Sequence, residues 1–452
     1  MSQDTYRCSR RHLLRLAGAA AAGAALSSCG VSPRRTSGAK AQLVYQDWRT
    51  EWFPGMAQQM LEEFHSTHPN IRVFYTPDPE NLEERMAADM QAGTAPDLFQ
   101  GCCTHFPIWA QAGYCLDLRP YVQADLPKEA IDDWDVAQYR SFFLRSGLQY
   151  GLPKYHGALG LYYNKDLFDS QDVDYPDSSW THDDYLTAMR RLTLDSDGDG
   201  HTDVWGSMLD VSWDRIQVHV NGWGGRFVDP QAPTRCLMGE PPAVEALQWL
   251  QDRMQADRVM ATVPNVQSKG TREAFAAGKL AMVEDGSWAL KDILSAAHFR
   301  VGVAPMPAGP VRRVTLATTD GFGIYAGTRY PDAAWELLKF LVSKEYGRAM
   351  ARASFLQPAR ASLVEEWAGF IRTEFPAKAK DVDIAAFADG HLKGYSVTAE
   401  IFANMAEAKE LANEAWSQIL TLGLAPAESI KSTCEQIEAA QTVQAGATGG
   451  CC

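Results

Sequence analysis

The sequence is poor in positive charge and in long apolar runs. It has 42 lysine and arginine residues but 56 aspartate and glutamate residues, which gives a formal net charge of −14. This negative charge disfavours nucleic acid or an anionic membrane surface as the main partner. The apolar stretch that ends at Leu26 is too short and too rich in glycine and alanine for a membrane span. The signatures Gly-x-Ser-x-Gly, His-Glu-x-x-His and a phosphate-binding loop ending in Lys-Ser or Lys-Thr are also absent, so no motif supports an enzyme.

The sequence predicts an export signal over residues 1–28. A basic start, a short apolar stretch and small residues before a cleavage point are typical of such signals. The pair Arg10-Arg11 resembles a twin-arginine signal, although one such pair also serves the general route. The Leu-Ser-Ser-Cys run that ends at Cys29 resembles a bacterial lipobox; the alternative is an ordinary signal with an incidental cysteine. We expect lipidation at Cys29, a tether over 29–40 and an extracytoplasmic lipoprotein anchored to the cell membrane.

Strand-like and helical segments alternate from residue 42 onward. Gln42–Tyr45 and Ile71–Tyr75 are typical of strands, whereas Phe53–His65 has apolar residues at helical spacing. This alternation predicts an α/β fold in which helices cover a parallel sheet. Residues 446–452 are expected to be a disordered tail. Further expected strands are Leu159–Tyr163, Leu280–Val283, Val301–Ala304 and Gly323–Ala326, and further expected helices are Asn81–Gln91, Thr181–Leu192 (with a capping box of Thr181 and Asp184), Ala243–Gln255, Thr271–Ala277, Pro331–Leu341 and Met405–Leu422.

Nine cysteines are spaced too irregularly for a zinc site, which requires two close pairs. Export makes disulfides possible. Cys102 or Cys103 with Cys115 is the nearest plausible pair, but the connectivity of these cysteines, Cys236 and Cys434 stays open.

Several short segments occur in a characteristic order over residues 42–345. They are Ala95–Phe99 (APDLF), Ala112–Leu118 (AGYCLDL), Gly151–Phe168 (GLPKY, then LYYNKDLF), Phe275–Trp288 (FAAGKLAM, then GSW) and Gly321–Leu341. Together they resemble the extracellular solute-binding proteins of bacterial sugar ABC importers, the family that includes maltose-binding protein.

The resemblance implies a type II periplasmic-binding-protein fold of two α/β lobes joined by crossing strands. The crossings would fall near Leu152–Lys154, Ala304–Pro307 and Leu356–Arg360. Lobe one would comprise 41–152 and 305–355, and lobe two 155–303 and 358–445. A carbohydrate, expected to be an oligosaccharide, would bind between the lobes and be delivered by a monomer to an ABC permease, with no cofactor and no catalysis.

A sugar-binding site needs flat aromatic surfaces for the ring faces and planar polar groups for the hydroxyls. Trp288 follows a strand and a glycine turn, where the family places a sugar-stacking aromatic. Trp223 lies among glycine and asparagine, which leave no helix or strand to bury it. His105 and Trp109 are weaker candidates, because Trp109 fits a helix face. The expected ligand-binding residues are Asp47, Trp48, Tyr155, His156, Trp223, Trp288 and Asp320.

The segment Asp195–Asp203 (DSDGDGHTD) matches the first half of a calcium-binding loop. Gly206 replaces the final bidentate glutamate, so a full EF-hand is not expected. The alternative is a solvated acidic turn. A structural Ca²⁺ would be held by Asp195, Asp197, Asp199, His201 and Asp203.

Two other functions also fit the sequence. A secreted glycoside hydrolase would use Glu284 or Asp285 with Asp320, and its two carboxylates would need to be about 5–10 Å apart. A binder of another solute, such as a polyamine or an iron complex, is a further alternative.

Overall fold

The computed structural model describes residues 40–268 and 270–448. The expected signal peptide, Cys29 and most of the tether lie outside the described residues. Within them, no helix has the length and apolar character needed to cross a membrane.

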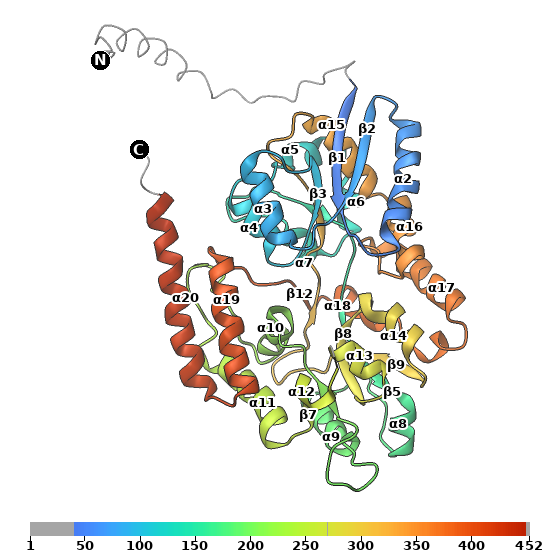
Figure 1. Ribbon diagram of the computed structural model, residues 1–452, viewed down its shortest axis with the longest axis vertical. Helices are drawn as coiled ribbons and strands as arrows, with labels where there is room; N and C mark the ends of the chain where they lie inside the picture. Colours follow the sequence, from blue (N-terminus) through green and yellow to red (C-terminus); the bar gives the residue numbers. More distant parts are fainter. Residues whose placement is uncertain (1–39, 269, 449–452) are drawn as a thin grey trace, which may run out of the picture. The chain divides into compact units, whose positions relative to one another are not determined.

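Lobe one is built on a five-stranded sheet (Figure 1). Strand β1 pairs in parallel with β2 and β3, whereas β11 is antiparallel to both β3 and β4. Helix α2 buries Phe53, Met60 and Phe64 at the helical spacing that the sequence predicts. The elements are β1 (Ala41–Asp47), α2 (Phe53–Thr67), β2 (Ile71–Pro77), α3 (Leu82–Ala92), β3 (Leu98–Gly101), α4 (His105–Gln111), α5 (Arg119–Asp125), α6 (Lys128–Asp132), α7 (Val136–Ser141), β4 (Leu152–Pro153), β11 (Gly321–Ile324), α15 (Pro331–Leu341) and α16 (Lys344–Ser354).

Lobe two contains a three-stranded sheet in which β5 pairs antiparallel with both β8 and β9. Every residue of β5 is buried, because packed layers cover both of its faces. The predicted capping box of Thr181 and Asp184 begins α9 and is confirmed. The elements are β5 (Leu159–Asn164), α8 (Lys165–Ser170), α9 (His182–Leu192), β6 (Ser207–Met208), α10 (Trp213–Gly222), α11 (Pro241–Gln251), β7 (Met260–Ala261), α12 (Val263–Val266), α13 (Thr271–Ala276), β8 (Met282–Gly286), α14 (Leu290–Ala296), β9 (Val301–Ala304), β10 (Thr315–Leu316), α17 (Val364–Glu374), α18 (Ala386–Lys393), β12 (Ser396–Val397), α19 (Met405–Trp416) and α20 (Pro426–Thr448).

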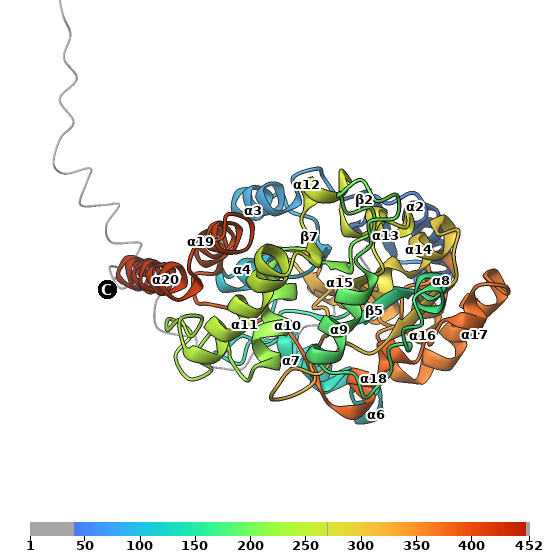
Figure 2. The same ribbon diagram turned by 90° about the horizontal axis from the view of Figure 1, so that it is seen from below.

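The C-terminal helices α19 and α20 lie side by side against lobe two (Figures 1 and 2). A disulfide joins Cys236 to Cys434 on α20, although the two cysteines are 198 residues apart in sequence. Cys102, Cys103 and Cys115 are free thiols. The pairing that proximity in sequence suggested is therefore wrong, because the fold brings distant segments together. Helix α20 also continues to Thr448, beyond the predicted start of the tail at 446.

Three segments connect the lobes and are hydrogen-bonded to one another. The Lys154 amide donates to the Asp320 carbonyl (3.0 Å), and the Thr318 amide donates to the Gly157 carbonyl (2.9 Å). The His156 amide donates to the Gln357 carbonyl (3.0 Å). The first crossing is thus 154–158, the second 317–320 and the third Leu356–Arg360.

The second crossing differs from the expected Ala304–Pro307. The Ala308 amide donates to the Trp180 carbonyl of lobe two at 2.8 Å. Strand β10 then pairs in parallel with β12 near the crossings, and the chain joins the lobe-one sheet only at Gly321. Residues 305–316 therefore extend lobe two rather than begin lobe one, because their backbone groups find their partners there.

Candidate ligand-binding site

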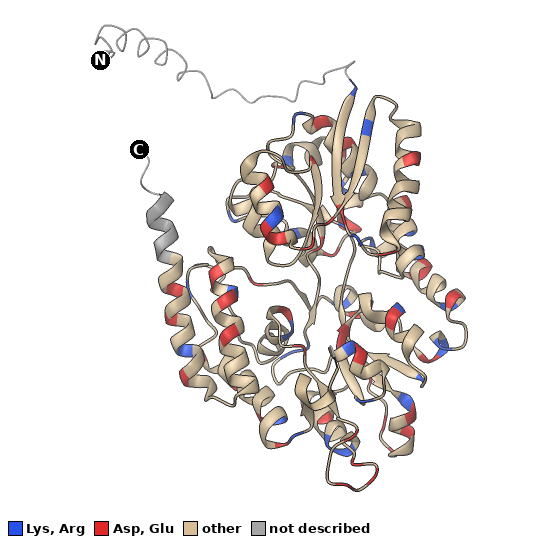
Figure 3. Cartoon of the chain, viewed as in Figure 1, with Lys and Arg blue, Asp and Glu red and all other residues tan. Residues whose placement is uncertain are grey.

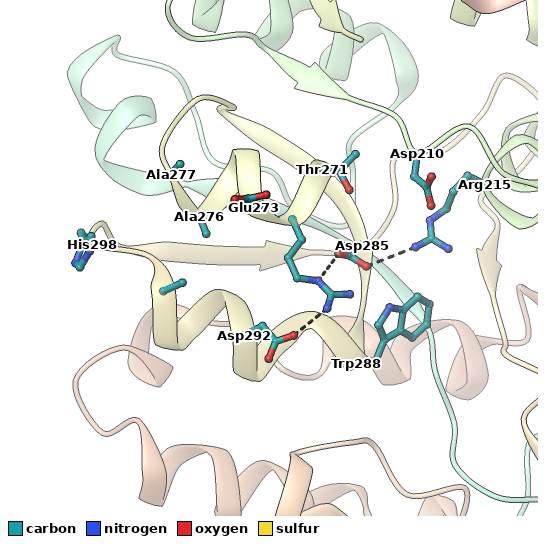
Figure 4. Close-up of a pocket in the computed structure, with 13 residues that line it drawn as sticks. Asp210, Arg215, Thr271, Glu273, Ala276, Ala277, Asp285, Trp288, Asp292 and His298 are labelled. Atoms are coloured by element: carbon teal, nitrogen blue, oxygen red, sulfur yellow. Dashed lines mark hydrogen bonds and ion pairs between the residues drawn. The ribbon is translucent and has the colours of Figure 1, made fainter. Parts of the chain in front are cut away.

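A cavity of about 840 Å³ opens in lobe two beside Trp288 (Figure 4). Its walls come from α10, α13, α14 and the end of β8. Trp288 is half-buried and packs against core residues of both lobes, so it marks the junction between them. The cavity-lining residues are Asp210, Arg215, Gly270, Thr271, Arg272, Glu273, Ala276, Ala277, Asp285, Trp288, Asp292, Ala296 and His298.

Charged side chains beside Trp288 form a connected network (Figure 4). The Arg215 guanidinium lies 5.3 Å from the centroid of the Trp288 ring, and its Nη2 is 3.5 Å from Asp285 Oδ1. Arg272 donates from Nε to Asp285 (3.1 Å) and from Nη1 to Asp292 (2.9 Å). Guanidinium and carboxylate groups are planar and bind pairs of hydroxyls, and an indole offers an apolar face. These groups together suit a ligand with apolar faces and a hydroxyl rim.

The predicted residues of lobe one do not line this cavity; Asp47 and Trp48 lie around a buried lysine, Lys154. Lys154 Nζ donates to the Asp47 carboxylate, and both side chains have no exposed surface. The ammonium also lies 3.1 Å from the centroid of the Trp48 ring, a cation–π contact that orients the indole. The Tyr155 ring packs edge-on against Trp48 at 5.4 Å. Trp48 is half-buried, whereas Tyr155 is buried.

Asp47 does not reach the surface, contrary to the prediction that it binds hydroxyls. Burial raises the pKa of Asp47 and lowers the pKa of Lys154, and their mutual attraction opposes both shifts. Asp320 is buried as well and accepts a hydrogen bond from Gln100 Nε2 (3.4 Å). Burial raises the pKa of Asp320 to about 7, against the opposing charge of Lys154.

Trp223 lies away from this region, in the core of lobe two. It is the C-terminal cap of α10, and its ring centroid lies 4.7 Å from that of His182 and 5.6 Å from that of Trp249. The argument that its glycine neighbours leave it without a helix is therefore wrong. Of the weaker candidates, Trp109 is a core residue of lobe one.

His156 lies in the first crossing and not in the cavity. It is buried close to Asp135 and His391, and burial lowers its pKa to about 4. His105 is buried on α4, outside the cavity, with Nδ1 3.4 Å from Glu83 Oε1.

The glycoside hydrolase alternative is not favoured by the acids in lobe two. Glu284 is buried and accepts a hydrogen bond from His219 Nε2 at 3.0 Å. Burial raises the pKa of Glu284, but its neighbours His219, His182 and Arg215 together outweigh this and the net pKa is lowered, which is unsuitable for a general acid. Asp285 is held by two arginines.

The acidic loop after α9 is visible in Figure 3. Asp195, Asp197 and Asp203 each offer a carboxylate oxygen, and these oxygens lie within 4.8 Å of one another. The backbone amides of Gly198 and Gly200 donate to Asp195 at 2.7 and 2.9 Å. Asp199 and His201 are not part of this cluster.

Sequence reasoning missed Lys154, Arg215, Arg272, Asp135 and His391. Lys154 stands within the Gly151–Tyr155 motif, and its place in that motif at the expected first crossing was the available signal. The others lie on segments with no recognisable motif, and only the fold brings them beside their partners.

Two α/β lobes joined by three hydrogen-bonded crossings define a two-lobed type II periplasmic-binding-protein fold, and the cavity lies in lobe two with Trp288 at its edge. A family model described as bacterial extracellular solute-binding protein matches residues 48–348. The chain therefore belongs to the family of bacterial extracellular solute-binding proteins.

Individual relatives are distant in sequence. A binding protein of Brucella abortus is 24% identical over 313 residues, covering 66% of this chain and 70% of that protein. The maltotriose-binding protein of Pyrococcus abyssi is 22% identical over 300 residues, 63% of this chain and 59% of that one. The solved structure of an ABC substrate-binding protein from Listeria monocytogenes in complex with cycloalternan has a TM-score of 0.76 at 22% identity, covering 89% of this chain and 99% of that chain. This structural likeness shows the fold.

Proposed function

We propose that the protein captures an oligosaccharide at the junction of its lobes and delivers it to an ABC permease without altering it. The observation that carries this proposal is the cavity of about 840 Å³ in which Trp288, Arg215 and Asp285 converge. That volume lies in the upper part of the usual range for small-molecule sites, which favours several sugar rings over one. The names of the Pyrococcus and Listeria relatives, which refer to maltotriose and cycloalternan, support the same class of ligand.

Calorimetry of the protein with linear and cyclic glucose oligosaccharides, mannitol and spermidine tests this proposal. We expect saturable binding of one oligosaccharide class, with the sugar recovered intact after incubation. Binding of spermidine with no sugar bound would identify a polyamine carrier instead. Cleavage of the sugar would support the hydrolase.

The delivery step fits a monomer held at the outer face of the membrane through lipid on Cys29. The Leu-Ser-Ser-Cys run that ends at that position supports this anchoring. Mass spectrometry of the membrane fraction should find acylated Cys29, and Cys29→Ser should release the protein from that fraction. Light scattering of the released protein should give the mass of one chain.

The loop after α9 is proposed to bind a structural Ca²⁺ through Asp195, Asp197 and Asp203. Three clustered carboxylates support this, because they repel one another in the absence of a cation. Ca²⁺ should raise the melting temperature of the wild type and not that of Asp197→Asn. An equal rise in both would place the ion elsewhere.

A further inference from the structure

A second cluster of ligand-type side chains lies at the crossings, outside the cavity. Asp135 is the N-cap of α7 in lobe one, His156 belongs to the first crossing, and His391 is on α18 in lobe two. Each offers one nitrogen or oxygen atom, and the three atoms lie within 4.8 Å of one another. His391 Nδ1 is 2.7 Å from Asp135 Oδ2, and His156 Nε2 is 3.9 Å from the same oxygen.

His156 is left without a hydrogen bond. Its side chain is 3% exposed, and neither ring nitrogen has a hydrogen-bond partner among the described residues. A buried polar group in this condition costs about 1–3 kcal/mol, so it requires an explanation. His156 Nε2 faces Asp135 Oδ2 at 3.9 Å, which is too far for a hydrogen bond but suitable for two atoms that bind the same metal ion.

The separations fit a tetrahedral metal ion. Zinc binds histidine nitrogen and carboxylate oxygen at about 2.0–2.2 Å, which places neighbouring ligand atoms roughly 3.4 Å apart. The separations of the two histidine nitrogens from Asp135 Oδ2, 2.7 and 3.9 Å, lie on either side of that value, and the two nitrogens lie within 4.8 Å of each other, so shifts of about 1 Å would complete the arrangement. Two imidazoles and one carboxylate are a ligand set for zinc rather than for Ca²⁺ or Mg²⁺, which take oxygen ligands.

We propose that Asp135, His156 and His391 form a zinc-binding site at the hinge of this protein. The Asp135 carboxylate is already oriented for the role, because its other oxygen, Oδ1, accepts a hydrogen bond from the backbone N–H of Gln138 at 2.7 Å. The Gln138 side chain in turn donates to the carbonyls of Tyr155 (2.8 Å) and Thr318 (2.6 Å), which ties the site to two crossings.

The ion would join the lobes. Its ligands come from lobe one, from a crossing and from lobe two, so zinc binds the arrangement that brings Asp135 and His391 together. By mass action, zinc stabilises that arrangement against others in which the two are apart. Zinc would thereby regulate the movement of the lobes, independently of which solute the cavity holds.

Calorimetric titration of ZnCl₂ into the metal-free full-length chain tests the proposal. The protein is purified without a polyhistidine tag, and the variant Cys102→Ser/Cys103→Ser/Cys451→Ser/Cys452→Ser serves as the background, because adjacent thiols also bind zinc. We expect one zinc per chain. Binding should weaken at least about 100-fold in His156→Gln and in His391→Gln, since loss of outer hydrogen-bond partners alone costs up to that much. His68→Gln, which removes a partly exposed histidine of lobe one, should bind as the background does.

Cobalt substitution provides an independent measurement. Co²⁺ bound at this site should give the intense visible absorption of tetrahedral coordination, and zinc should abolish it. His391 is partly exposed, so His391→Gln keeps the test valid if His156→Gln fails to fold. Absence of zinc binding, or binding unchanged in His391→Gln, overturns the proposal. Ca²⁺ should neither compete with Co²⁺ nor alter its spectrum, which separates this site from the acidic loop.

Discussion

The buried pair of Lys154 and Asp47 allows a sharp prediction about stability. Lys154→Met keeps the length and apolar character of the side chain beneath Trp48 but leaves the Asp47 carboxylate uncompensated. Both side chains have 0% exposure, so the loss should be that of a broken buried ion pair, about 3–5 kcal/mol. For a lobe of 150–250 residues, 1 kcal/mol corresponds to about 2–4 °C in melting temperature. The melting temperature of the lobe that contains the pair should therefore fall by roughly 10 °C.

The control is an ion pair of the same chemistry on the surface. Lys128 and Asp132 are bonded on α6, but their side chains are 81% and 55% exposed, so Lys128→Met should leave the transition unchanged. Asp47→Leu combined with Lys154→Met should recover most of the loss, because no buried charge remains.

Urea denaturation followed by circular dichroism at pH 7 measures all four proteins. The reasoning would be refuted if Lys154→Met lost less than about 1 kcal/mol, the ceiling for an exposed pair. It would also be refuted if the double variant were less stable than Lys154→Met, since charge compensation would then not be the cause.

Three further predictions concern the ligand site, the titration of the second crossing and the C-terminal helix. Trp288→Ala should weaken binding of the oligosaccharide about 10–100-fold by calorimetry, as for other buried aromatic anchors, while Trp249→Phe should bind normally; equal affinities would remove Trp288 from the site. Burial raises the pKa of Asp320 from 3.8 to about 7, so the folded chain retains a proton that the unfolded chain releases between these values. Stability should therefore fall by up to about 4 kcal/mol between pH 4 and pH 7, and urea titrations should show a smaller fall for Asp320→Asn, whereas parallel profiles would contradict the raised pKa. Removing the disulfide by Cys236→Ser/Cys434→Ser should cost about 2–5 kcal/mol and make the melting temperature insensitive to reductant; a reductant effect that persists would point to another bond.

The sequence predicts local structure better than it predicts contacts between residues that are distant in the chain. Phe53–His65 appears as α2 and the capping box at Thr181 appears as expected, because both depend on residues a few positions apart. The disulfide, the buried lysine beneath Trp48 and the cluster around His156 each unite residues more than 100 positions apart, or residues on different lobes. The spacing of residues in the sequence does not predict these long-range contacts.

Trp223 and Trp288 illustrate the same limit within the site. Both have a glycine one or two positions before them in the sequence, yet one caps α10 in the core and the other lies beside the cavity. What separates them is the packing of α10 against the histidine and tryptophan rings behind it, which arises only in three dimensions. The role of Trp288 in binding stays a prediction.

The hydrogen bonds among the three crossings constrain how the lobes move. A single connecting strand can twist by changing its own dihedral angles. Here the first crossing is hydrogen-bonded to both of the others through Lys154, His156 and Gly157. A twist in one crossing therefore strains the hydrogen bonds that join it to the others. The connection therefore behaves as a ribbon, which bends readily across its flat face and resists torsion. Opening and closing should follow one direction, and the surface presented to a permease should alternate between two defined shapes.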